Sequence, residues 1–113
     1  MYPYSAIIPT SASDNRKYDH NYMLADKIIE TVRVFYNLQR GYQCSKSHDT
    51  VSVSAKQACR YFLTTLAGMG PVEIGRMTNF DHSTIIVSLQ SVYGFIKHGD
   101  RLADDLKRIE AMI

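Results

Sequence analysis

The sequence lacks long apolar runs, has few cysteines and carries little net charge, and each shortage argues against a class of protein. No apolar stretch of the 113 residues approaches the roughly 20 that span a bilayer. The first residues, Met1 to Tyr4, lack the basic and then apolar segments of a secretory signal. The two cysteines, Cys44 and Cys59, are therefore expected to be reduced. We expect a cytoplasmic protein that does not enter a membrane.

Catalytic and metal-binding motifs are also scarce. The chain has no Gly-x-x-x-x-Gly-Lys-Ser/Thr loop, which argues against an ATPase of that type. Ser83 follows His82, but neighbours on a helix point about 100° apart and make a poor nucleophile–base pair. Cys44 and His48 have the spacing of metal ligands, yet no second pair follows. We therefore expect no enzyme, no metal and no cofactor.

Positive charge is modest and unevenly distributed. The formal net charge is +2, which is low for a protein that binds nucleic acid by bulk electrostatics. Residues 51–99 contain four basic and two acidic residues, whereas residues 100–113 contain three basic and four acidic ones. The basic excess therefore lies in the middle of the chain. If this segment binds DNA, we expect moderate affinity or help from a second DNA-binding unit.

The apolar spacing predicts an all-α fold, a compact bundle of about five helices in one domain. Residues 1–18 contain most of the prolines and predict a flexible arm, which offers a site for a protein partner. Helices are expected over residues 21–40, from Ser52 or Ser54 to Gly68, and after an Asp100 N-cap, with a loop over residues 42–51. The predicted core residues include Leu24, Ile28, Val32, Phe35, Leu38, Phe62, Leu63, Leu66, Ile74, Ile85, Ile86, Leu89, Val92, Tyr93, Ile96, Leu102, Leu106 and Ile109.

A helix-turn-helix is predicted between these helices. Residues 70–76 indicate a short helix with Pro71 at its first position, and residues 78–80 a tight turn. Asp81 has the place of an N-cap before a longer helix that ends at Gly99. A short helix, a tight turn and a longer helix are the parts of a helix-turn-helix. The first turn of the longer helix carries only side chains that form hydrogen bonds, and such turns contact base edges in the major groove.

The motif resembles a known family. Glu73-Ile74-Gly75, a short turn and then residues 81–86, Asp-His-Ser-Thr-Ile-Ile, are similar to the signature of the C-terminal DNA-binding domain, domain IV, of the bacterial replication initiator DnaA. That family typically shows Ile-Gly, a turn and Arg-Asp-His-Ser/Thr-Thr-Val/Ile. The helix before the motif is also similar, at residues 55–58 and 61–63. The resemblance implies that residues 19–113 form a helical domain with a Trp-repressor-like helix-turn-helix, and that double-stranded DNA is its partner.

The resemblance also assigns roles to residues. It implies that Asp81, His82 and Ser83 contact base edges and that Thr84 contacts a phosphate. Lys56 and Gln57, on the helix before the motif, resemble further phosphate contacts. Pro71 and Val72, at the start of the short helix, match positions that contact thymine methyl groups. A reduced basic loop and one arginine of the short helix complete the candidate DNA contacts: Asp81, His82, Ser83, Thr84, Lys56, Gln57, Pro71, Val72, Arg76, Lys46 and His48.

Three departures from the family pattern shape the functional hypothesis. Phe80 stands where the family has arginine, and the turn is one residue shorter. Only Lys46 and His48 remain of the basic loop that enters the minor groove in the family, and the chain contains no ATPase domain. Phe80 either faces DNA or packs in the core, and we favour the core. We expect a standalone DnaA-like regulator of replication or transcription, with a phage or mobile element as a candidate source. The alternative is a protein-interaction module that keeps the fold and binds a replication or regulatory protein.

Overall fold

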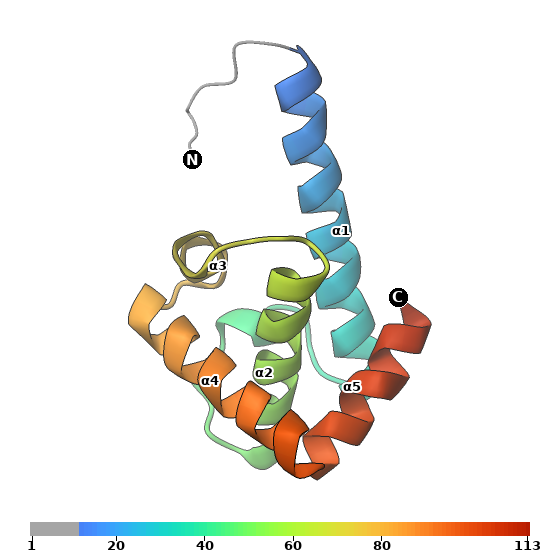
Figure 1. The fold of residues 1–113 in the computed structure, drawn as a ribbon, viewed down its shortest axis with the longest axis vertical. Coiled ribbons are helices and arrows are strands. Elements are labelled where there is room, and N and C mark those ends of the chain that lie inside the picture. The colour runs from blue at the N-terminus through green and yellow to red at the C-terminus, as the bar shows by residue number, and fades with distance from the viewer. Residues whose placement is uncertain (1–11) are drawn as a thin grey trace.

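The protein is all-α over the residues that its computed structural model describes, which are the backbone from residue 12 and side chains from residue 22 to residue 113. The elements are α1 Ala12–Tyr36, the 3-10 helix η1 Tyr42–Cys44, α2 Thr50–Thr65, α3 Pro71–Thr78, α4 His82–His98 and α5 Arg101–Met112 (Figure 1). The predicted bundle of about five helices is confirmed. None of the described helices is long and apolar enough to cross a membrane.

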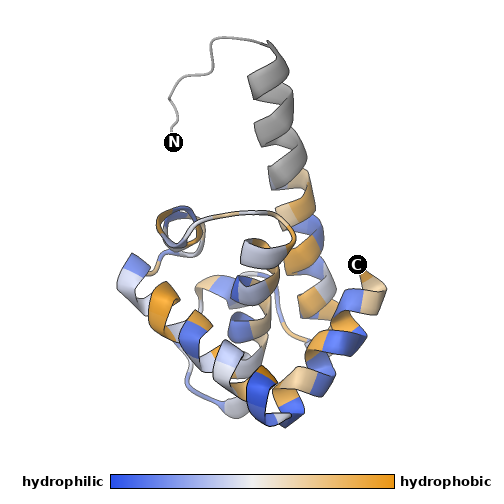
Figure 2. Ribbon diagram, in the orientation of Figure 1, coloured by the Kyte–Doolittle hydropathy of each residue, from blue (hydrophilic) through white to orange (hydrophobic). Residues whose placement is uncertain are grey.

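Helix α2 lies at the centre of the bundle. It contacts each of the other four α-helices, and α4 in turn contacts both α3 and α5. Its buried residues include Phe62 and Leu63, which face Ile28 of α1, Ile74 of α3 and Ile109 of α5 in one apolar cluster. Apolar and polar residues alternate along α4 and α5, as expected for helices buried on one side (Figure 2). The core therefore holds α3 and α4 against α2.

The predicted bounds of the first helix are wrong at both ends. Helix α1 begins at Ala12, within the predicted arm, because no proline or glycine interrupts residues 10–40. It ends at Tyr36, four residues before the predicted end. Asn37 takes the left-handed conformation, with φ 56°, and the N–H of Leu38 donates to the carbonyl of Arg33 at 3.0 Å. The predicted arm from residue 1 to 11 lies outside the described residues.

The second helix also differs from the prediction. Asp49 is its N-cap and accepts a hydrogen bond from the N–H of Ser52 at 3.1 Å, so α2 begins at Thr50 rather than Ser52 or Ser54. It ends at Thr65, and the chain turns at Gly68, which has a φ of 70°. The predicted loop over residues 42–51 contains η1 and the first two residues of α2.

The core prediction for α4 is only half correct. Ile85, Leu89 and Val92 are buried, whereas the predicted core residues Ile86, Tyr93 and Ile96 are 40%, 49% and 37% exposed. Leu66, near the end of α2, is likewise exposed rather than buried, at 39%. Apolar residues spread over more of the α4 circumference than α2, α3 and α5 cover. Helix α4 therefore presents apolar side chains to solvent.

Candidate nucleic-acid interface

Helices α3 and α4 form a tightly joined helix-turn-helix. Pro71 is the first residue of α3, as predicted, and Asn79 ends the helix with a φ of 59°. The N–H of Phe80 donates to the carbonyl of Gly75 at 2.9 Å. A Cβ atom at Gly75 would lie 2.5 Å from the carbonyl oxygen of Phe80. Only glycine lets the backbone of α3 lie this close to the backbone of the turn, so Gly75 is what allows α4 to begin directly beside α3.

The first turn of α4 faces solvent. Asp81, His82, Ser83 and Thr84 are all exposed, and Asp81 has the N-cap position. Asp81 is the N-cap residue as predicted, but its side chain accepts no hydrogen bond from the helix backbone. Its carboxylate instead accepts the Ser83 hydroxyl at 2.9 Å and lies 3.4 Å from Nδ1 of His82. The Asp81 carboxylate therefore holds the Ser83 hydroxyl and lies beside the His82 ring.

Lys46 joins the basic loop to the turn of the motif. Its Nζ donates to the carbonyl of Asn79 at 2.8 Å and lies 3.7 Å from the centre of the Phe80 ring. The Lys46 side chain remains exposed in this position. An exposed cation therefore lies beside the N-terminus of α4, where the resemblance expects a DNA contact.

Lys56 is not the exposed phosphate contact that was expected. Its side chain is buried, and its Nζ donates to the carbonyls of Ser45 and Ser47, each at 2.8 Å. Burial lowers the pKa of Lys56, and the nearby charges of Arg60 and Lys46 lower it further. Lys56 thus fastens the 45–47 segment to α2 instead of reaching solvent.

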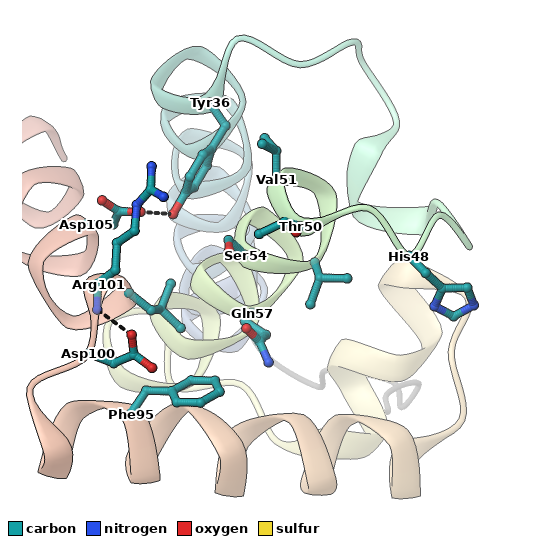
Figure 3. A pocket seen from close by; sticks show the side chains of 12 residues that line it. Tyr36, His48, Thr50, Val51, Ser54, Gln57, Phe95, Asp100, Arg101 and Asp105 are labelled. Atoms are coloured by element: carbon teal, nitrogen blue, oxygen red, sulfur yellow. Dashed lines mark hydrogen bonds between the residues drawn. The ribbon is translucent and has the colours of Figure 1, made fainter.

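Gln57 and His48 line a cavity of about 430 Å³ between α1, α2, α4 and α5 (Figure 3). Gln57 lies opposite Phe95, in the last part of α4, and His48 comes from the loop before α2 (Figure 3). The structure therefore groups these two side chains around the cavity rather than with His82.

The three candidate DNA contacts on α3 are exposed to solvent to different extents. Pro71 is half-buried, Arg76 is exposed, and the Val72 side chain is 52% exposed. Val72 and Arg76 can therefore contact a partner without rearrangement, whereas Pro71 mainly begins the helix.

Arg60 joins α2 to α4, a role that the sequence pattern did not indicate. It is buried, its NH1 group donates to the Ser88 hydroxyl of α4 at 2.9 Å, and its Nε has no described partner. Burial lowers its pKa. Lys56 and Arg60 are four residues apart and share one face of α2, but periodicity cannot show that this face is covered.

Phe80 packs against the core and is half-buried, in agreement with the favoured core role. The centre of its ring lies 3.7 Å from Lys46 Nζ, 4.7 Å from the guanidinium carbon of Arg60 and 5.6 Å from Lys56 Nζ. Three cations thus surround the position where the family has arginine. An arginine at this position would repel all three, whereas the aromatic ring attracts them.

No metal-ligand cluster of three or more His, Cys, Asp or Glu occurs among the described residues. Cys44 and Cys59 are free thiols, and burial raises the pKa of Cys59 to about 12. Comparisons of the chain with protein-family models, curated proteins and solved structures find no match. The resemblance to DnaA therefore rests on the motif residues themselves.

Proposed function

We propose that this protein binds double-stranded DNA sequence-specifically through α3 and α4 and thereby regulates replication or transcription. The observation that carries the proposal is the exposed first turn of α4, Asp81 to Thr84, directly after a tight turn from α3. The first turn of the second helix of such a unit contacts base edges in the major groove.

The distribution of charge supports DNA as the partner. Helix α4 contains no acidic residue among its 17 residues, and its basic side chains are His82, Lys97 and His98. The acidic residues Asp104, Asp105 and Glu110 instead lie on α5. Beyond the Asp81 carboxylate at its N-cap, α4 therefore adds no negative charge that would repel a polyanion. Exposed Lys46 and Arg76 supply positive charge on the motif and its neighbouring loop.

The side chains of the first turn suit base recognition. The His82 imidazole and the Ser83 hydroxyl can both form hydrogen bonds with base edges. The Ser83 hydroxyl donates to the Asp81 carboxylate, and Nδ1 of His82 lies 3.4 Å from it. A carboxylate in this position can also accept from the amino group of cytosine. Thr84 and Lys46 are assigned to phosphates, and Val72 to a thymine methyl group. Buried Lys56 takes no part in this assignment, because it holds the loop that carries Lys46.

Selection from a pool of random duplexes tests the proposal. The full chain should enrich a short defined sequence, and its affinity for that duplex should fall as salt rises, because phosphate contacts release counterions. Failure to enrich any sequence at low salt would contradict the proposal.

A protein-interaction module remains the second candidate, because one side of α4 is apolar and exposed. Tyr93 and Ile96 are 49% and 37% exposed, and the Tyr93 ring lies 6.0 Å from the Tyr61 ring of α2. Exposed aromatic and aliphatic groups are typical of protein interfaces. Binding of a protein partner that depends little on salt, with no DNA binding, would favour this candidate.

A further inference from the structure

Val87 is the most exposed aliphatic residue of α4. It is 60% exposed, whereas Ile85 is fully buried and Leu89 is 8% exposed. Ser83, four residues earlier, and Gln90, three residues later, are exposed as well. Residues three and four apart lie on one face of a helix. Val87 therefore extends the outward face that begins with the first turn of α4.

An exposed valine at this position contributes little to the core and is free to contact a partner. If the first turn of α4 enters the major groove, Val87 lies one helical turn further along the same face. The apolar group that base pairs present in the major groove is the C5-methyl group of thymine. A methyl group at the same carbon of cytosine offers the same surface.

We propose that Val87 contacts the C5-methyl group of a pyrimidine, so that the DNA target contains thymine or 5-methylcytosine at this step. Ile86, which is 40% exposed, flanks this contact. The inference rests on the proposed DNA-binding function and goes beyond it by naming a chemical group in the target. The family resemblance assigned methyl contacts to α3 only, at Pro71 and Val72.

Two observations favour DNA rather than a protein on this face. The face is continuous with the exposed hydrogen-bonding turn at His82 and Ser83, and α4 contains no acidic residue over its whole length. Apart from the Asp81 carboxylate at the N-cap, which accepts the Ser83 hydroxyl, α4 adds no negative charge that would repel phosphate strands. If a second copy of the chain bound this face instead, the protein would form a dimer, and Val87→Ala would weaken that dimer.

The test uses the duplex enriched from the random pool, in which each thymine is replaced in turn by uracil, which lacks the methyl group. For the unaltered protein, one replacement should weaken binding about fourfold, the effect of losing one buried methyl contact. The same replacement should have almost no effect on Val87→Ala. The matched control is Val34→Ala, because Val34 is an aliphatic residue of α1 with similar exposure, 53%, and this variant should respond to uracil like the unaltered protein.

A second arm distinguishes the two sources of the methyl group. At the thymine position that responds to uracil, duplexes with cytosine and with 5-methylcytosine are compared. The unaltered protein should bind the methylated duplex more tightly, whereas Val87→Ala should bind both equally. If Val87→Ala keeps the full response to uracil, or if no thymine position responds, the inference is wrong although DNA binding stands. A concentration-dependent dimer that Val87→Ala abolishes would also overturn it. Absence of any enriched duplex would instead refute the proposed function itself.

Discussion

At the scale of single residues, Phe80 is the position where one substitution separates the core role from the DNA-binding role. Phe80→Arg would bring a fourth cation among Lys46, Lys56 and Arg60, two of which are already buried. We expect a loss of about 2 kcal/mol in the free energy of unfolding, because a half-buried cation without a partner is strongly disfavoured. Thermal and urea unfolding measure this loss.

Phe80→Leu is the control for that substitution, because it keeps an apolar side chain at the same position and should lose less stability. A Phe80→Arg protein with an unchanged melting temperature and tighter DNA binding would show that the side chain faces the duplex.

Asp49 gives a prediction about pH. Hydrogen bonds from the Ser47 hydroxyl and from the N–H of Ser52 lower its pKa from 3.8 to about 2. Because the folded state favours the charged carboxylate, this stabilisation is complete above pH 3.8 and is lost as the pH falls through about 2.

The melting temperature should therefore fall more steeply in that interval for the unaltered protein than for Asp49→Asn, which still caps the helix but does not titrate. Identical pH profiles for the two proteins would contradict the proposed role of the Asp49 carboxylate.

Single-residue roles were predictable where they depend on local chain geometry and not where they depend on packing. The exposed first turn of α4 followed from its polar residues and its place at the helix start. Lys56 was misassigned because its burial depends on the 45–47 segment, whose carbonyls it binds. The Asp81 carboxylate holds Ser83 instead of capping the helix, and sequence alone cannot choose between two nearby donors.

At the scale of elements, the junction of α3 and α4 depends on Gly75. Gly75→Ala would place a Cβ atom 2.5 Å from the Phe80 carbonyl oxygen, so α3 and the turn must separate. We expect a loss of about 2–3 kcal/mol in the free energy of unfolding, within the range for overpacked sites. Circular dichroism during thermal unfolding would measure it.

Gly94 is the matched control for Gly75, because it lies inside α4 and a Cβ atom there would meet nothing within 4 Å. Gly94→Ala should stabilise the protein by roughly 0.5–1 kcal/mol, since alanine favours a helix over glycine. Equal effects of the two substitutions would mean that the close approach at Gly75 is not the reason for the glycine.

Element types were predictable, but their ends were less so. The spacing of apolar residues identified the helices, and Pro71, Gly99 and Asp100 marked ends that the structure confirms. Helix α1 is closed by Asn37 rather than by Gly41, because asparagine can also take the left-handed conformation that ends a helix. The exposed side of α4 was assigned to the core because spacing shows that a face is apolar, not whether another helix covers it.

At the scale of the whole molecule, the low net charge predicts a weak salt dependence of DNA binding. If only a few cations, such as Lys46 and Arg76, contact phosphates, the slope of log K against log salt should lie at about −2 to −4. Lys46→Ala should make this slope less negative by about one unit, whereas Lys107→Ala on α5 should leave it unchanged. Equal slopes for Lys46→Ala and the unaltered protein would remove Lys46 from the interface.

The most direct test of the central claim compares the two exposed histidines at opposite ends of α4, His82 in the first turn and His98 in the last. Each is changed to alanine, and binding to the enriched duplex and to a random duplex is titrated at one salt concentration. His82→Ala should weaken binding to the enriched duplex by about 1–3 kcal/mol and hardly affect the random duplex, while His98→Ala should change neither. Equal affinities of all three proteins for the enriched duplex would contradict base recognition by the first turn of α4.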